Sequence, residues 1–310
     1  MSDGQLDMLW YIRNRLHSEL NCTVHIAAVE YCTSPRYHSP YCSRSNNAAR
    51  LALAPYSRQP VQLEQVVQSL VYLLGHYRIP PSSLVIAGDS AGGALCISTL
   101  SHLLHPHPSI SVSPPLLAAP LAGVLLLSPW TSFATASASY RENSTHDALT
   151  PGITRRFRGA YLSGTDALPA TSDADAWRHA SASASADRDS PADPVLLEPS
   201  VTWAGVARAG YWLQATEAPP DWWAGIEDVA SRVMITAGIL ECFRDDILAL
   251  DATLRALKKR DGSEPALAVS SFLDHAVHAA PVNDFAFGVE PGEQMEEIIR
   301  WLKQTFRPQE

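Results

Sequence analysis

The sequence predicts an α/β protein in which a mostly parallel sheet is covered by helices on both faces. Three observations predict this class. Short apolar segments alternate with stretches of helical periodicity, the apolar segments carry few polar residues, and one of them leads through a glycine-rich turn into a helix. A strand buried on both faces is apolar along its whole length, whereas a half-exposed strand alternates. The pattern therefore favours a parallel sheet.

Five segments are expected to be the strands of this sheet. Each is short and nearly all apolar, as a strand in a sheet covered on both sides must be. In chain order they are Val24 to Val29, Leu84 to Ala87, Gly123 to Leu127, Val233 to Ala237 and Leu267 to Phe272.

Apolar residues at helical spacing predict the covering helices. One helix should follow Pro60, one should follow the fourth strand, and one should lie near the C-terminus. The helix after the fourth strand has acidic residues at its start and lysines at its end, which suits the helix dipole. The apolar positions are Leu63, Val66, Val67, Leu70 and Leu74; Ile247, Leu250, Leu254 and Leu257; and Met295, Ile298, Ile299 and Leu302.

The length of 310 residues agrees with a single domain covering residues 1–310. Two irregular segments interrupt it. Residues 32–52 show no periodicity and are expected to form an irregular insertion. Residues 155–225 are expected to form a lid that includes a low-complexity part, Thr171 to Asp193.

Composition excludes several classes of protein. Apolar residues make up 46% of the chain, which excludes a disordered protein, and a net charge of −9 argues against nucleic acid and anionic membranes as partners. Five cysteines do not suggest a disulfide framework. No run approaches 18 apolar residues, and the start Met1-Ser2-Asp3-Gly4 does not resemble a signal peptide, so we expect neither a spanning helix nor a signal peptide. We expect a cytoplasmic protein that needs no metal or organic cofactor, and the oligomeric state stays open.

One glycine-rich turn contains the candidate catalytic serine. The second predicted strand runs into Gly88-Asp89-Ser90-Ala91-Gly92-Gly93, and a helix with Leu95, Ile97, Leu100 and Leu103 follows. This is a G-x-S-x-G sequence inside strand, turn and helix, which distinguishes it from a plain glycine-rich turn. The glycines Gly88 and Gly92 allow a tight bend that exposes the Ser90 hydroxyl. The Ala91 N–H would then point to the position of an oxyanion.

A serine nucleophile needs a base, and the base needs an orienting acid. Two later loops offer them in the expected order of serine, acid and histidine. Glu241 and Asp245 follow the fourth predicted strand, and His275 and His278 follow the fifth. Asp245 lies at a helix start and could serve as its cap instead.

The segment Gly88 to Gly93 resembles the nucleophile elbow of the hormone-sensitive-lipase-like group of α/β-hydrolases, the α/β-hydrolase-3 family. Leu53-Ala54-Pro55 and Ser128-Pro129-Trp130 look like segments that follow two strands of this family. The likeness extends from about Val24 to the C-terminus, apart from the two irregular segments. It implies an α/β-hydrolase fold with a helical lid, and hydrolysis of a carboxylic ester through an acyl-enzyme.

The resemblance also distinguishes between the alternative site residues. Fungal members read E-x-x-x-D-D in the acid loop, which places the acid on Glu241 and leaves Asp245 as second choice. They read H-x-A-P at the base, which matches His278-Ala279-Ala280-Pro281 and leaves His275 as second choice.

The sequence departs from the family in two places. The H-G-G-G segment that completes the family's oxyanion hole does not occur in this chain, so we expect an N-terminally incomplete fold. Residues 32–52 separate Tyr31 from Leu53-Ala54-Pro55, whereas relatives have a single residue between the corresponding tyrosine and L-A-P. A late start codon and an unspliced intron would explain both, and sequencing the transcript would test this hypothesis.

Three functions remain open. The first is a serine hydrolase acting on the ester of a small or lipophilic substrate. The second is a catalytically impaired hydrolase fold that serves as a binding module, and the third is an acyl-transferring or tailoring enzyme of fungal secondary metabolism.

Other residues have simpler interpretations. His102, His105 and His107 are expected at a helix end, where protonated histidines suit the dipole, rather than on a metal. Cys32, His38 and Cys42 lack a second pair of zinc ligands. Trp222-Trp223 would either line an acyl pocket or pack under a cap.

Overall fold

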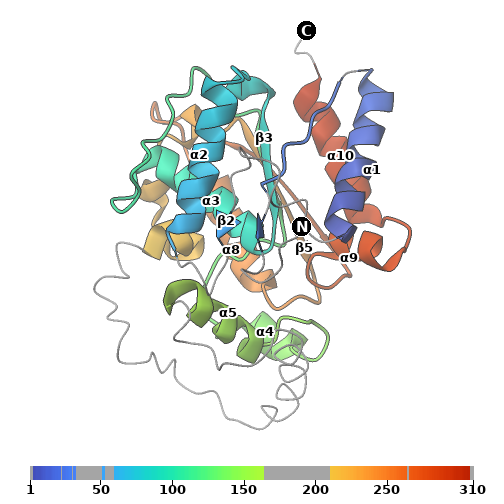
Figure 1. Ribbon diagram of the computed structural model, residues 1–310. Coiled ribbons are helices and arrows are strands. Elements are labelled where there is room, and N and C mark those ends of the chain that lie inside the picture. The colour runs from blue at the N-terminus through green and yellow to red at the C-terminus, as the bar shows by residue number, and fades with distance from the viewer. Residues whose placement is uncertain are drawn as a thin grey trace.

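A four-stranded parallel sheet lies at the centre of the molecule (Figure 1). The computed structural model describes residues 3–21, 23–29, 31–32, 51–52, 59–163, 210–263 and 265–307. The strand order is β3, β4, β5, β6, with every neighbouring pair parallel. The strands are β3 (Val85–Asp89), β4 (Gly123–Leu127), β5 (Arg232–Gly238) and β6 (Ala268–Asp274). Four of the five predicted strands are thereby confirmed.

The strand predicted at Val24 to Val29 is wrong. Residues 23–29 belong to no helix or strand, and Ile26 is exposed. An apolar segment becomes a strand only where a neighbour offers backbone partners. Among the described strands β3 pairs with β4 alone, and the two-residue strands β1 (Tyr31–Cys32) and β2 (Leu51–Ala52) pair with each other.

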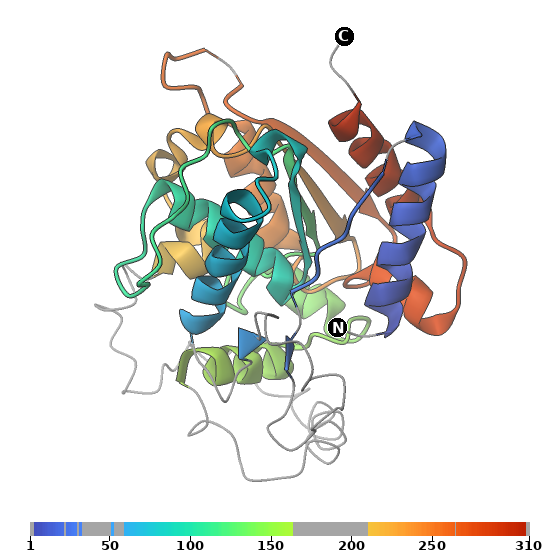
Figure 2. The ribbon, with the colours of Figure 1, turned by 45° about the horizontal axis from the view of Figure 1, so that its top comes forward.

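Helices cover both faces of the sheet, as the sequence predicts (Figures 1 and 2). On one face lie α1 (Asp3–Leu20), α9 (Ala280–Phe287) and α10 (Glu293–Phe306). On the other lie α3 (Ala91–Leu104) and α8 (Arg244–Arg255), and α2 (Val61–Gly75) packs against α3. The predicted helices are confirmed, except that Leu257 lies just beyond the end of α8.

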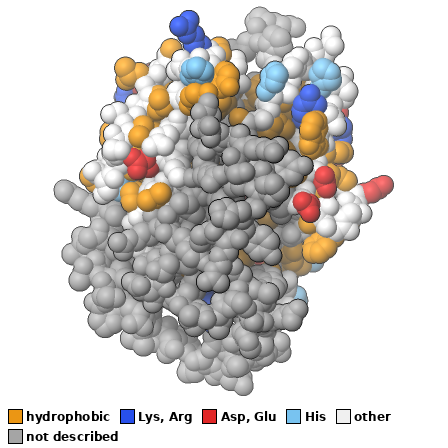
Figure 3. All heavy atoms as spheres, in the orientation of Figure 1, with side chains coloured by type: hydrophobic (Ala, Val, Ile, Leu, Met, Phe, Trp, Pro, Cys, Tyr) orange, Lys and Arg blue, Asp and Glu red, His pale blue; other side chains and the backbone are white. Residues whose placement is uncertain are grey.

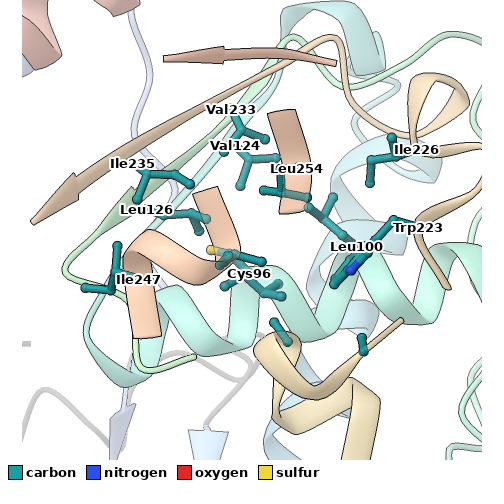
Figure 4. Packing of buried hydrophobic residues seen from close by; sticks show 14 of the residues in the cluster. Cys96, Leu100, Val124, Leu126, Trp223, Ile226, Val233, Ile235, Ile247 and Leu254 are labelled. Carbon is teal, nitrogen blue, oxygen red and sulfur yellow. The ribbon is translucent and has the colours of Figure 1, made fainter. Parts of the chain in front are cut away.

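Strand β4 shows how the two cores form. All five of its residues are buried. Because side chains alternate along a strand, Val124 and Leu126 join the core under α3 and α8, whereas Leu125 and Leu127 join the core under α1 and α10. Figure 4 shows the first of these cores, in which β4 and β5 side chains meet Cys96 and Leu254.

Smaller helices complete the described chain. They are α4 (Ala138–Asn143), α5 (Pro151–Ser163) and the short 3₁₀ helices η1 (Pro81–Ser83), η4 (Ala215–Glu217), η5 (Pro220–Trp223) and η6 (Ile226–Asp228). Of the predicted lid, the structure describes residues 155–163 and 210–225. The low-complexity part and nearly all of residues 32–52 lie outside the described residues.

The described surface has a mixed character. On the face in Figure 3, lysine and arginine side chains stand singly among hydrophobic and polar ones. Every helix in the described ranges is too short or too polar to cross a membrane. Cys96 and Cys242 are both free and buried.

Helix α1 packs closely on α9 through a glycine. A Cβ atom at Gly4 would lie 2.6 Å from the Ala286 Cβ and 2.8 Å from the Val282 carbonyl oxygen. Because a backbone atom cannot move aside as a flexible side chain can, only glycine allows this approach.

Near the start of α8, Asp246 is half-buried beside other acidic groups. Burial raises the pKa of Asp246 to about 7, and the charges of Asp245 and Glu217 add to the effect. In the unfolded chain the carboxyl has a pKa of about 3.9. The folded state therefore binds this proton more tightly, and stability falls as the pH rises from about 4 to about 7.

We expect Gly4→Ala to destabilise the protein by about 1 to 3 kcal/mol, because the new methyl group overpacks the contact between α1 and α9. Urea unfolding measures the change. Gly75→Ala is the matched control, since nothing lies within 4 Å of a Cβ there, and helix propensity should make it neutral or stabilising. Equal effects of the two substitutions would refute the packing argument.

We expect Asp246→Asn to stabilise the protein at pH 8, by up to about 4 kcal/mol, and to have little effect near pH 4. The variant removes a carboxyl that must ionise in a half-buried, partly desolvated position at high pH. Urea unfolding of both proteins at the two pH values measures the difference. The exposed Asp7→Asn is the control, and a benefit from Asp246→Asn that is the same at both pH values would contradict the mechanism.

Candidate active site

The predicted elbow has the strained backbone of a nucleophile turn. Ser90 connects β3 to α3 with φ 53° and ψ −117°. A non-glycine residue in such a region costs about 1 to 3 kcal/mol and persists only where its surroundings hold it. Two hydrogen bonds do so: the Ser90 N–H donates to the Leu127 carbonyl at 2.9 Å, and the Trp130 N–H donates to the Ser90 carbonyl at 3.0 Å.

Glycines make the bend possible. A Cβ atom at Gly88 would lie 2.3 Å from the carbonyl carbon of Gly92, so the two glycines approach as the sequence predicts. Gly93 has a role that the sequence analysis missed. A Cβ atom there would lie 2.8 Å from the Pro129 Cβ, so this glycine lets α3 pack against the chain that leaves β4.

The first amide of α3 is available for an oxyanion. The Ala91 N–H opens the helix, and none of the hydrogen bonds between described residues uses it. A free N–H at a helix N-terminus favours negative charge. The role of Ala91 in an oxyanion hole remains a prediction.

Glu241 and His278 form a buried pair. His278 Nδ1 lies 2.8 Å from Glu241 Oε2, and the imidazole donates to the carboxylate. Glu241 is fully buried, and its other oxygen accepts the Gly238 N–H at 2.9 Å. The ring of His278 stands edge-on to Phe243 with centroids 5.0 Å apart. With the proton on Nδ1, the Nε2 atom is free to act as a base.

The histidine loop is bonded to the residue beside the elbow. In the register of the sheet Asp89 lies opposite Leu127, so Ser90 and Ser128 leave paired strands together. The Ser128 Oγ accepts the Ala279 N–H at 3.0 Å. Among the hydrogen bonds of the described residues, none joins the Ser90 hydroxyl to His278, so that contact remains a prediction.

Asp245 has a structural role that differs from the expected one. Its carboxylate accepts the Ser139 N–H at 2.8 Å and pairs with Arg244 at 2.9 Å. The N-cap of α8 is Phe243, so Asp245 caps the start of α4 and not its own helix. In the described structure the acid that contacts His278 is Glu241, and His275 contacts neither acid.

Two of the three clustered histidines, His102 and His107, accept hydrogen bonds on a ring nitrogen and are not helix-end cations. His102 Nδ1 accepts the His107 N–H at 3.0 Å, and His107 Nδ1 accepts the Ser109 N–H at 3.2 Å. Burial lowers the pKa of both His102 and His107. The prediction of protonated rings is therefore wrong for these two. The described residues contain no group of three or more metal-binding side chains.

The two tryptophans pack against the far end of α3. Trp222 Nε1 donates to the Ser101 Oγ at 3.2 Å, and Trp223 is 1% exposed within the core (Figure 4). Ser101 lies three helical turns beyond Ser90, which is about 16 Å along the helix axis. This position supports packing and not the acyl pocket.

The structure adds two residues beside the candidate site that the sequence analysis missed, Gln5 and Gly238. Gln5 of α1 donates to Asp89, the residue before Ser90, at 2.8 Å. Gly238 has no room for a Cβ atom, which would lie 2.2 Å from the Ala276 carbonyl oxygen. Gly238, the last residue of β5, and Ser128, the first residue after β4, are local signals that could have been found in the sequence. Nothing local in the sequence marks Gln5.

Burial also excludes Cys242 as a nucleophile. It raises the pKa of this thiol to about 12, and the charges of Asp147 and Glu241 add to the effect. The thiol next to the acid therefore stays protonated at neutral pH.

Comparisons with known proteins agree with the fold described above. Residues 48–198 match a family model described as an α/β hydrolase fold, a span that includes Ser90 and ends before Glu241 and His278. A search of curated proteins finds no match.

Three solved structures are similar in fold. A mutant of the esterase E40 has 19% identity and a TM-score of 0.53 over 82% of this chain and 64% of that one. Carboxyl esterase 2 from the mycorrhizal fungus Tuber melanosporum has 19% identity and 0.53 over 83% and 66%. An esterase of the bacterial hormone-sensitive lipase family has 20% identity and 0.53 over 82% and 64%.

This chain therefore spans slightly less than two thirds of the length of these structures. At such identities the likeness concerns the fold. Together with the family model, which matches slightly less than half of this chain, it identifies an α/β-hydrolase fold.

Proposed function

We propose that the protein is a serine hydrolase that cleaves the carboxylic ester of a small or lipophilic substrate through an acyl-enzyme. The observation that carries the proposal is the Glu241–His278 pair at 2.8 Å, bonded through Ala279 and Ser128 to the strand end beside the strained Ser90. A serine on such an elbow, a histidine with Nδ1 held by a carboxylate, and a free helix amide are the parts that acyl transfer requires.

In this mechanism the Ser90 Oγ attacks the ester carbonyl carbon while His278 Nε2 takes the hydroxyl proton. The carbonyl oxygen becomes an oxyanion, which the Ala91 N–H stabilises. His278 then gives its proton to the departing alcohol, and an acyl-enzyme remains. Water attacks the acyl-enzyme with His278 as base, which releases the acid and restores Ser90. Glu241 stabilises the imidazolium in both steps.

A catalytically impaired hydrolase fold is the second candidate. The observation in its favour is that no hydrogen bond between described residues joins Ser90 to His278. Catalytic hydrogen bonds are often long before substrate binds, so this observation is also compatible with an active hydrolase. A labelling experiment separates the active hydrolase from the impaired fold.

We expect a fluorophosphonate probe to label the wild-type protein and to leave Ser90→Ala unlabelled, because the probe captures an activated serine. Labelling is read by intact-protein mass spectrometry. Ser83→Ala, at an exposed position before β3, is the matched control and should label like the wild type. Equal labelling of wild type and Ser90→Ala, or none of either, would favour the impaired fold.

We expect Glu241→Gln to reduce kcat for p-nitrophenyl esters by about 10⁴-fold, because an amide donor facing Nδ1 imposes the wrong tautomer on His278. Asp245→Asn is the matched control, since that carboxylate contacts Ser139 and Arg244 instead. Steady-state kinetics of both variants measure the effect. A larger loss in Asp245→Asn than in Glu241→Gln would move the acid to Asp245.

The same assay with an added small alcohol separates hydrolysis from acyl transfer. A hydrolase releases mainly the free acid, whereas an acyl-transferring or tailoring enzyme, as in fungal secondary metabolism, forms mainly the new ester. Chromatography of the products decides between the two.

A further inference from the structure

The loop that carries Glu241 is bonded to a segment about one hundred residues earlier. Asn143, the last residue of α4, donates from Nδ2 to the Ile239 carbonyl at 3.0 Å and to the Glu241 carbonyl at 2.9 Å. In the turn that follows, Asp147 Oδ2 accepts the Cys242 N–H at 2.7 Å.

A third side chain of this segment also forms a hydrogen bond to the backbone of the loop that carries Glu241. The Ser139 Oγ donates to the Cys242 carbonyl at 2.7 Å. Ser139, Asn143 and Asp147 are spaced four residues apart, so the first two lie on one face of α4. We call these three residues the acid-loop clamp.

The clamp satisfies three of the four polar backbone groups of Glu241 and Cys242. The fourth, the Glu241 N–H, donates to the Gly238 carbonyl at 3.3 Å. Buried backbone groups nearly always find partners, but usually in a helix or a sheet. Here side chains from another segment provide them, which fixes the position of one particular peptide.

The clamp is shielded from water. Ser139, Asn143 and Asp147 are 0%, 4% and 7% exposed, and Glu241 and Cys242 are both 0% exposed. Hydrogen bonds in such an environment are strong, and a partner left without one is costly. The loop cannot shift without breaking several of these bonds together.

Fixing the backbone of Glu241 also fixes its carboxylate. One oxygen is held by the Gly238 N–H and the other by His278, so the backbone position sets where the imidazole stands. A misplacement of about 1 Å in such a site can reduce the rate by about 100-fold.

We propose that Asn143, Asp147 and Ser139 are positioning residues for the reaction, because they hold the peptide of Glu241 and so orient His278 toward Ser90. The proposal rests on the proposed hydrolase function. It adds a role for the segment 138–147, which contains neither the nucleophile, the acid nor the base.

The test compares Asp147→Ala with Asp147→Asn. The alanine variant leaves the Cys242 N–H without its acceptor, and kcat for p-nitrophenyl esters should fall by about 10- to 100-fold, with KM changing less than about 2-fold. Asparagine keeps an acceptor oxygen and should restore most of the rate. Glu142→Gln is the matched control, because Glu142 reaches the same loop through an exposed ion pair with Arg244 and should leave kcat unchanged.

A second readout does not depend on activity. The His278 Nδ1–H proton, bonded to Glu241, should give a downfield NMR resonance in histidine-labelled protein, assigned by its loss in His278→Asn. We expect it to weaken or vanish in Asp147→Ala and to persist in Asp147→Asn and Glu142→Gln. A wild-type protein that shows this resonance but hydrolyses no ester would refute the proposed function, while the effect of Asp147→Ala on the resonance would still decide the clamp.

The proposal is refuted if the Asp147→Ala variant folds, keeps the wild-type kcat and the His278 Nδ1–H resonance, and differs only in a lower melting temperature. That result would show a purely structural role. If Asp147→Ala does not fold, Ser139→Ala decides, since it removes one hydroxyl and one bond to the loop. It should lower kcat by about 3- to 10-fold and weaken the resonance, and an unchanged rate and resonance would reject the proposal.

Discussion

Parallel pairing of β3, β4, β5 and β6 is the constraint on which the rest of the structure depends. Parallel strands end at the same edge, so the residues that follow them meet there although they are far apart in the chain. Ser90 follows β3, Ser128 follows β4, the loop of Glu241 follows β5 and the loop of His278 follows β6. The candidate site consists of these four connections.

The same edge concentrates backbone strain. Three of the five described non-glycine residues with positive φ lie there: Ser90, Ser128 and Ala279. Each conformation costs about 1 to 3 kcal/mol and needs support. The Ser90 N–H reaches Leu127, the Ser128 N–H reaches Thr236 and the Ala279 N–H reaches the Ser128 hydroxyl. Each strained residue is therefore held by the neighbouring strand or by another strained residue, which makes the edge rigid.

Much of this arrangement could be predicted from local patterns. Strands β3 to β6 and helices α3, α8 and α10 follow from apolar runs and periodicity, because their residues face the same cores along their length. Helix α2 follows in the same way from its buried Leu63, Val67 and Leu70. The segment Val24 to Val29 has the same apolar pattern but no strand, because pattern alone does not provide a neighbouring strand. Asp245 also looked like a cap, and it is one, but for a helix that begins about one hundred residues earlier.

The sequence by itself determined the strand, turn and helix around Ser90, since the tight bend needs glycine at Gly88 and Gly92 and these are local neighbours. It also limited the acid and the base to two candidates each. Only the tertiary structure decided which acid meets the histidine. Glu241 and Asp245 lie four residues apart, and long-range contacts separate their roles: the Glu241 carboxylate faces His278, whereas the Asp245 carboxylate faces Ser139 of α4. Such contacts leave no signature in either local segment, because each partner is supplied by a distant part of the chain.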